Sequence, residues 1–319
     1  MDLLEIAGLS VSFATPAGAL RAVDDLSLSI RSGRVLGLVG ESGCGKTMTA
    51  LSVMNLVPPP GRIDTGEVRF EGRNLLVLPA DEMRKVRGAR ISMIFQEPMT
   101  ALNPVFTVGN QISEVLTTHE NIAKSEALGR SIELLRSVGI PSPEKRFYEY
   151  PHQLSGGMRQ RVMIAMAIAC RPSLILADEP TTALDVTIQA HILDLLTRIQ
   201  AEMGMAMVLV THDLGLIAER AHEVAVMYAG RIVEQADTGT LFSAPLHPYT
   251  RGLLASIPRP GETKRSRLRT IAGTVPRLSD LPKGCAFQPR CDLRTGQCET
   301  GPDLVEAAPG HKVRCWKAK

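Results

Sequence analysis

A short apolar run that leads into a glycine-rich loop limits the folds open to this chain. Residues 35–39 read Val-Leu-Gly-Leu-Val, and residues 40–47 continue as Gly-Glu-Ser-Gly-Cys-Gly-Lys-Thr. The loop fits the pattern G-x-x-x-x-G-K-[ST], in which backbone N–H groups surround phosphate oxygens where a strand passes into a helix. The chain is therefore predicted to be α/β, with a mixed or parallel core sheet and helices between its strands.

Two kinds of strand pattern recur along the chain. Continuous apolar runs are typical of strands covered on both faces of a parallel sheet, whereas alternating patterns indicate strands with one buried face. An Ala229-Gly230 pair between two further apolar runs predicts a β-hairpin. The expected strands are residues 35–39, 174–177 and 207–210 in the core sheet, 9–13, 26–30 and 66–70 in a small N-terminal antiparallel sheet, and 224–228 with 231–233 in the hairpin.

Helical spacing marks an insertion at about residues 98–170. Leu128, Ile132, Leu135 and Val138 lie three or four residues apart, and a glycine and a proline follow closely. Prolines and the charged run at 264–267 mark a boundary after the hairpin. The predicted domains are residues 1–240, which include the helical subdomain, and a small cysteine-containing C-terminal region of residues 241–319.

Several function classes are excluded or disfavoured by composition. A membrane-spanning helix needs about 20 consecutive apolar residues, and residues 162–170 form the longest clean run. The first five residues are acidic where a secretory signal is basic, so the chain is expected to be cytoplasmic. Residues 259–319 hold 13 Lys and Arg against six Asp and Glu, but four tyrosines and one tryptophan leave little aromatic surface for stacking bases. No nucleic-acid partner is predicted.

The glycine-rich loop supplies the first set of candidate site residues. Its glycines let backbone N–H groups close around phosphate, Lys46 reaches the β and γ phosphates, and the Thr47 hydroxyl can ligate Mg²⁺. The residues expected to bind the nucleotide here are Gly40, Ser42, Gly43, Cys44, Gly45, Lys46 and Thr47.

Two adjacent carboxylates end the apolar run of residues 174–177. Ionised groups beside an apolar layer are costly unless something pairs with them, so packing alone does not explain Asp178 and Glu179. We expect Asp178 to hold the Mg²⁺ shell. Glu179 is then placed to orient or deprotonate the water that attacks the γ-phosphate.

A second anion-binding segment precedes another helical run. Ser155, Gly156 and Gly157 lie where a helix begins, and a helix N-terminus offers bare N–H groups and a favourable dipole. The Ser155 hydroxyl and the Gly157 N–H could cap the γ-phosphate that the first loop leaves exposed. One chain thus carries two phosphate-binding segments.

The order of these motifs resembles that of the ATP-binding cassette (ABC) ATPases over residues 1 to about 240. The resemblance implies the P-loop ABC fold, and it implies that Leu-Ser-Gly-Gly-Met at 154–158 is a signature motif serving the ATP of a neighbouring subunit. It also assigns Gln96 to the loop that senses Mg²⁺ and the membrane partner, and His212 to the γ-phosphate. The D-loop matches Ala183-Leu184-Asp185, and Phe13 falls where an aromatic ring stacks on adenine; taken alone, Phe13 would be a core residue.

The C-terminal half narrows the resemblance to a subfamily. His-Pro-Tyr-Thr-Arg-Gly-Leu-Leu at 247–254, Gly284-Cys285 and Pro289-Arg290-Cys291 resemble the C-terminal region of oligopeptide/dipeptide importer ATPases. This implies an ATP-hydrolysing subunit that couples dimer closure and hydrolysis to permease movement, with residues 98–104 gripping a permease helix. The implied partners are a second, related ATPase in a heterodimer, two permeases and an extracytoplasmic solute-binding protein, at the cytoplasmic face of the inner membrane. The alternatives are import of nickel or another small solute, a soluble ABC ATPase, and a nucleotide-gated regulator.

Four of the six cysteines crowd into the C-terminal region, with the spacing C-x5-C-x6-C-x16-C. Disulfides are not expected in a reduced cytoplasm, and the spacing lacks the C-x-x-C knuckle of common zinc modules. Four thiolates suit a [4Fe–4S] cluster, which the resembled importer ATPases can carry. Zinc and an unmetallated region are the alternatives. The expected ligands are Cys285, Cys291, Cys298 and Cys315.

Overall fold

The computed structural model describes residues 2–16, 18–182, 184–257 and 271–318, and the chain forms two compact units. The charged run at 264–267 and Ala183 of the predicted D-loop lie outside the described residues. The first unit consists of Met1–Ile30, Val35–Leu76 and Leu209–Lys319, and the second consists of Arg31–Arg34 and Val77–Val208.

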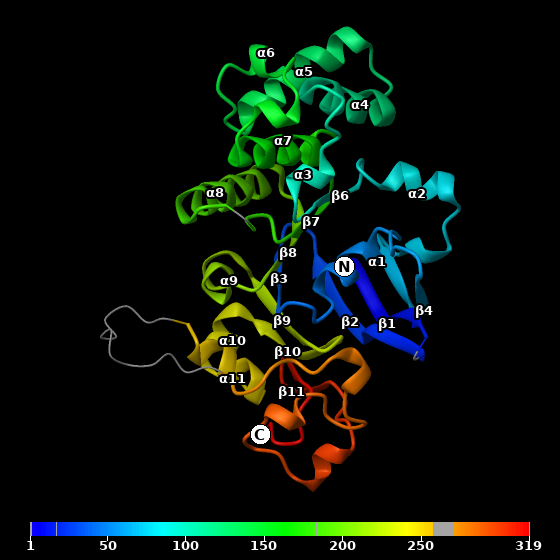
Figure 1. The fold of residues 1–319 in the computed structure, drawn as a ribbon, viewed down its shortest axis with the longest axis vertical. Helices are drawn as coiled ribbons and strands as arrows, with labels where there is room; N and C mark the ends of the chain where they lie inside the picture. Colours follow the sequence, from blue (N-terminus) through cyan, green and yellow to red (C-terminus); the bar gives the residue numbers. More distant parts are fainter. Residues whose placement is uncertain (1, 17, 183, 258–270, 319) are drawn as a thin grey trace. The chain divides into compact units, whose positions relative to one another are not determined.

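An antiparallel sheet at the N-terminus belongs to the first unit, with strand order β2-β1-β4-β5. Figure 1 labels the first three of these strands. β1 and β4 pair from Leu4 opposite Phe70 to Phe13 opposite Gly61, with an irregular register around Ser10. The predicted antiparallel sheet is confirmed, but its strands are longer than the alternating pattern indicated because the hydrogen-bonded ladder continues past the buried positions. Their bounds are β1 (Asp2–Thr15), β2 (Gly18–Arg31), β4 (Gly61–Phe70) and β5 (Arg73–Asn74).

The first unit also contains part of a second, mixed sheet. Within this unit the strands of the second sheet follow the order β11-β12-β10-β9-β3. β3 and β9 are parallel, and β9 and β10 form the predicted hairpin. Ala229 and Gly230 turn it with φ angles of 47° and 85°, as a tight two-residue turn requires. The strands are β3 (Val35–Val39), β9 (Glu223–Tyr228), β10 (Arg231–Asp237), β11 (Val305–Ala308) and β12 (His311–Val313).

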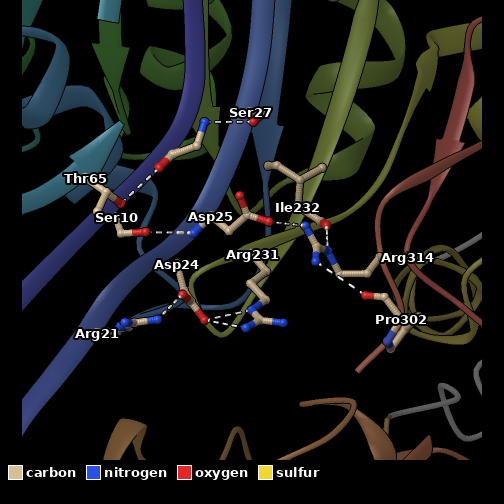
Figure 2. A network of polar contacts seen from close by, with 11 residues as sticks. Ser10, Arg21, Asp24, Asp25, Ser27, Thr65, Arg231, Ile232, Pro302 and Arg314 are labelled. Carbon is tan, nitrogen blue, oxygen red and sulfur yellow. Dashed lines mark hydrogen bonds and ion pairs between the residues drawn. The ribbon is translucent and has the colours of Figure 1, made fainter. Parts of the chain in front are cut away.

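The last two strands were not predicted from the sequence. β12 pairs antiparallel with β10, so the C-terminal segment extends the sheet of the first unit. Arg314, which follows β12, is buried and donates from Nε to the Ile232 carbonyl at 3.1 Å and from a terminal nitrogen to the Asp25 carboxylate at 3.5 Å (Figure 2). The buried Glu234 carboxylate of β10 contacts the His311 ring of β12 at 2.8 Å. The C-terminal segment is therefore fixed to the sheet by both backbone and side chains.

Asp24 is the centre of a second group of contacts in Figure 2, where it accepts hydrogen bonds from Arg231 at 2.8 Å and Arg21 at 2.9 Å. Burial by itself would raise the pKa of Asp24, but the hydrogen bonds and charges of Arg231 and Arg21 outweigh it and hold the pKa below 3.8. An acid with a lowered pKa stabilises the fold above its ordinary pKa, and this contribution is lost as the pH falls through 3.8 and below.

We therefore expect Asp24→Asn to lower the free energy of unfolding at pH 7 by about 1 kcal/mol, between the values typical of exposed and buried ion pairs. Urea denaturation of both proteins should show this difference at pH 7 and a smaller one at pH 3. A difference that does not change with pH would contradict the ionic role of Asp24.

Short helices cover the sheet of the first unit. Gly37 in the middle of β3 allows a close approach, since a Cβ atom there would lie 2.7 Å from the Ile217 side chain of α9. The helices are α1 (Lys46–Val53), α9 (Leu214–Arg220), α10 (Thr238–Ser243) and α11 (Pro248–Ala255), with 3₁₀ turns η3 (Leu278–Asp280), η4 (Gln288–Arg290) and η5 (Gly296–Glu299).

The second unit is built from helices around two parallel strands. β6 and β7 pair in parallel, and every residue of both strands is buried. The continuous apolar run at 174–177 predicted β7, whereas β6 was not predicted from the sequence. β8 (Ala206–Thr211) carries the chain from this unit back into the first. No helix in the described ranges is long and apolar enough to cross a membrane. The other elements are η1 (Leu75–Val77), α2 (Ala80–Val86), β6 (Ile91–Ile94), α3 (Pro98–Ala101), α4 (Val108–Glu120), α5 (Lys124–Ser137), α6 (Pro143–Arg146), η2 (Pro151–Gln153), α7 (Gly156–Ile168), β7 (Leu174–Asp178) and α8 (Val186–Met203).

The predicted helix at residues 128–138 is confirmed as α5, and Leu135 and Val138 are buried as their spacing indicated, but Leu128 is not. Leu128 is 37% exposed, whereas Ala127 and Ser131 are fully buried. Ser131 contacts Ser113 of α4 through their hydroxyl oxygens at 2.9 Å. Because Ala127 and Ser131 are small, α4 and α5 can approach closely at these positions. Leu128 then lies on the side of α5 that faces solvent.

Candidate functional site

The phosphate loop of residues 40–47 links β3 to α1 in the first unit and depends on two glycines. Gly45 is the N-terminal cap of α1 with a φ of 108°. A Cβ atom at Gly45 would lie 2.4 Å from the Ala22 carbonyl oxygen, and one at Gly40 would lie 2.2 Å from the Met227 carbonyl oxygen. Both distances are impossible for real atoms, so a side chain at either position would displace the loop from the strands beneath it.

The loop separates a buried side from an exposed one. The Lys46 side chain is buried, and its ammonium group donates hydrogen bonds to the carbonyl oxygens of Gly40 at 2.7 Å and Glu41 at 3.2 Å. Cys44 is buried below the loop, and burial raises the pKa of its thiol, so it acts as an apolar support. Ser42, Gly43 and Thr47 are exposed.

The two carboxylates lie at the end of β7 in the second unit, as predicted. Asp178 is the last residue of β7 and is buried. Glu179 follows with a φ of 43°, which turns the chain sharply. Its carboxylate accepts hydrogen bonds from the Gln96 amide at 3.3 Å and from the Thr182 hydroxyl at 2.9 Å. The structure thus brings Gln96 to Glu179 across 83 residues of sequence.

Thr182 was missed by the sequence analysis, although its position offers a local signal. A hydroxyl three residues after a carboxylate at a strand end can reach back across a tight turn. The Thr182 backbone N–H also donates to the Glu179 carbonyl at 3.1 Å, so the turn itself orients this carboxylate.

The segment Ser155–Gly157 begins α7 in the second unit. Ser155 is the N-terminal cap, and its hydroxyl accepts the Met158 N–H at 3.3 Å, which leaves the hydroxyl proton available to an acceptor. Asp185 caps α8 in the same way through the Ile188 N–H at 3.0 Å. Both caps line one surface hollow, whose other lining residues include Gly156, Gly157, Arg161 and Leu184.

Two further predicted site residues, His212 and Phe13, lie in the first unit. His212 follows β8 and is exposed, just before Asp213 caps α9. Phe13 lies in β1 opposite Gly61, and a Cβ atom at Gly61 would meet its ring at 2.7 Å. Phe13 therefore packs across the antiparallel sheet, and its stacking on adenine stays a prediction.

The four C-terminal cysteines line one small cavity together with His247, Phe287 and Trp316. Burial, with smaller effects of neighbouring thiols, raises the pKa of Cys285 and Cys291. The Lys317 backbone N–H points at the Cys315 sulfur at 3.4 Å. Four soft sulfur donors around one cavity fit the chemistry of an iron–sulfur cluster or zinc. However, no three His, Cys, Asp or Glu side chains of the described residues are arranged to hold a metal ion.

Comparisons with known proteins agree along the whole chain. Residues 23–182 match the family described as ABC transporter, and residues 233–298 match the C-terminal region of oligopeptide/dipeptide transporters. A probable peptide ABC transporter ATP-binding protein, y4tR of Sinorhizobium fredii, is 51% identical over 99% of this chain and 95% of its own length. The dipeptide transport ATP-binding protein DppD of Escherichia coli is 50% identical over 99% of this chain and 96% of its own length.

A solved structure is similar to the larger part of the chain. The ATP-binding cassette MJ0796, a dimer in a post-hydrolysis state bound to ADP and phosphate, matches with a TM-score of 0.67 at 26% sequence identity. The match covers 74% of this chain and 98% of MJ0796. It confirms the predicted fold class.

Proposed function

The chain belongs to the ABC transporter family, and on that premise we propose that it is the ATP-hydrolysing subunit of an importer of dipeptides or oligopeptides. The observation that carries this proposal is similarity along the whole length. Relatives named for peptide and dipeptide transport match 99% of the chain, and the region beyond the cassette matches an oligopeptide/dipeptide transporter family.

We propose roles for the site residues that follow from their chemistry. Lys46 and backbone N–H groups of residues 40–47 bind the phosphates, with Phe13 on the adenine. Thr47, Asp178 and Gln96 would hold Mg²⁺, which when bound neutralises phosphate charge.

Hydrolysis then depends on groups around the γ-phosphate. Glu179 orients the attacking water and accepts its proton, and the hydrogen bonds from Gln96 and Thr182 fix the direction of this carboxylate. His212 contacts the γ-phosphate.

The signature segment is proposed to complete the ATP site of a second, related ATPase subunit. The Ser155 hydroxyl and the first N–H groups of α7 face a hollow that Asp185 also lines, which suits a group that caps a phosphate. ATP would then hold two subunits together in a heterodimer, and hydrolysis would let them separate.

Two permeases and an extracytoplasmic solute-binding protein complete the proposed importer, with this chain peripheral at the cytoplasmic face of the inner membrane. Exposed apolar side chains support a permease contact after Gln96, since Met99, Val105 and Phe106 are 57%, 71% and 49% exposed. Purification of the tagged chain from solubilised membranes should recover both permeases, and the reconstituted complex should import a labelled dipeptide with ATP. Recovery without membrane proteins would support a soluble ATPase, and uptake of nickel alone would support the alternative solute.

The C-terminal cysteines are proposed to hold a [4Fe–4S] cluster with a structural role. Four sulfur ligands would surround it, and binding would require the thiols to lose their protons. We expect anaerobically purified protein to absorb broadly near 400 nm and Cys291→Ser to abolish this band. Cys170→Ser, which changes a cysteine outside the cavity, should keep it. Stoichiometric zinc in place of iron would contradict the proposal.

A further inference from the structure

Glu41, the second residue of the phosphate loop, is held by two residues from the C-terminal half of the chain. The Tyr249 hydroxyl accepts the Glu41 backbone N–H at 2.9 Å. Arg290 donates to both carboxylate oxygens of Glu41, at 2.7 and 3.1 Å. Main chain and side chain of one loop residue are thus fixed by groups 208 and 249 residues further along the sequence.

The surroundings of Arg290 make this a rigid contact. Its side chain is 4% exposed and also donates to the Ala272 carbonyl at 3.0 Å. The guanidinium lies 5.9 and 6.0 Å from the ring centres of Tyr228 and Phe287, within the range of cation–π attraction. Tyr228, Tyr249 and Phe287 pack against one another with ring centres 4.7 to 5.4 Å apart. A buried arginine held in this way fixes the direction of its partner.

The charge of Glu41 explains why the loop needs such a partner. A carboxylate in a loop that binds a polyphosphate repels the ligand, and this repulsion acts over several ångströms unless a cation neutralises it. The Lys46 ammonium donates to the Gly40 and Glu41 carbonyl oxygens, whereas Arg290 donates to the Glu41 carboxylate. The Glu41 side chain is 31% exposed, so without Arg290 it could turn towards the phosphates.

We propose that Arg290 is a positioning residue for ATP binding. It neutralises the Glu41 carboxylate and, together with Tyr249, fixes the main chain and side chain of Glu41 so that neither hinders the nucleotide. Arg290 ends η4, in the peptide between Cys285 and Cys291, so the C-terminal region sets the ATP affinity of the loop. This inference rests on the proposed function for ATP binding at residues 40–47.

The test measures ATP affinity by titration of a fluorescent ATP analogue with the full chain. We expect Arg290→Gln to weaken binding by about tenfold or more, as the loss of a charge-assisted pair beside an anionic ligand implies. The turnover number at saturating ATP should change less than twofold. Arg294→Gln removes an exposed arginine of the same region and should bind ATP like the wild type.

A double variant separates charge from packing. Glu41→Gln combined with Arg290→Gln should regain most of the affinity, because the unpaired carboxylate is gone, whereas a purely structural role of Arg290 predicts no recovery. Should Arg290→Gln fail to fold, Arg290→Lys keeps the charge but loses the paired hydrogen bonds and the contact with the rings, so it should bind ATP about threefold to tenfold more weakly than the wild type. Glu41→Gln added to Arg290→Lys should restore most of that affinity.

Wild-type affinity in Arg290→Gln, or no recovery when Glu41→Gln is combined with either Arg290 variant, would overturn the inference. A wild-type chain that binds no ATP would refute the proposed function and this inference together.

Discussion

Glu179→Gln is expected to reduce ATP turnover by about 10²- to 10⁴-fold, the range that a positioned general base contributes, while ATP binding is retained. The substitution keeps the shape of the side chain and removes its capacity to accept a proton. Hydrogen bonds from Thr182 and Gln96 orient the Glu179 carboxylate in the wild type. The loss of turnover in the variant would therefore reflect the missing proton acceptor. Single-turnover assays and nucleotide titrations of the purified complex measure the two quantities separately.

The same variant tests whether ATP joins two subunits. If the triphosphate is not cleaved, ATP should accumulate between the signature segment of one subunit and the phosphate loop of the other, and light scattering should detect more paired ATPase subunits. Glu202→Gln changes an exposed carboxylate on α8 and should behave like the wild type. Unchanged turnover in Glu179→Gln would contradict the catalytic role of Glu179. Subunit pairing that does not increase with ATP would contradict the role of ATP between two subunits.

Lys46→Ala should lose both nucleotide affinity and turnover, with a decrease of about 10²-fold or more, comparable to the removal of one donor from a preorganised anion site. The buried ammonium donates to two loop carbonyls, so its removal also leaves these acceptors without their donor. Titration with a fluorescent ATP analogue and steady-state hydrolysis would measure both losses.

A matched lysine provides the control for that experiment. Lys85 is 74% exposed on α2 and pairs with Glu82 at the surface, so Lys85→Ala should keep full activity. Circular dichroism must show that Lys46→Ala is folded. A folded Lys46→Ala variant that hydrolyses ATP at the wild-type rate would exclude the phosphate loop as the catalytic nucleotide site.

Local patterns predicted those parts of the molecule that depend on neighbours in sequence. The strands around residues 35–39 and 174–177, the hairpin at Ala229-Gly230 and the phosphate loop all arise from short-range rules of burial and backbone freedom. Only the family resemblance placed Gln96 and Glu179 in one site, because no local sequence pattern links two residues 83 positions apart.

Other features depend on packing that no local pattern encodes. β11 is exposed along its whole length and carries no alternation of apolar residues, so it gave no strand signal. Glu41 and Arg290 both lie in motifs that the sequence singles out, but nothing local joins two residues 249 positions apart, and their contact depends on the aromatic rings packed around Arg290. Leu128 fits a helical spacing and still faces solvent, because Ala127 and Ser131 permit a closer approach of α4.

The pairing of β12 with β10 also bears on how the gene can be shortened or fused. Removal of the residues after Thr300 would uncover the backbone donors and acceptors of β10, and an unpaired strand edge is a template for pairing with other chains. Such a truncated protein should precipitate during expression even if its cassette is otherwise complete. In any fusion protein, the added segment must therefore leave Val313 able to pair with Glu234.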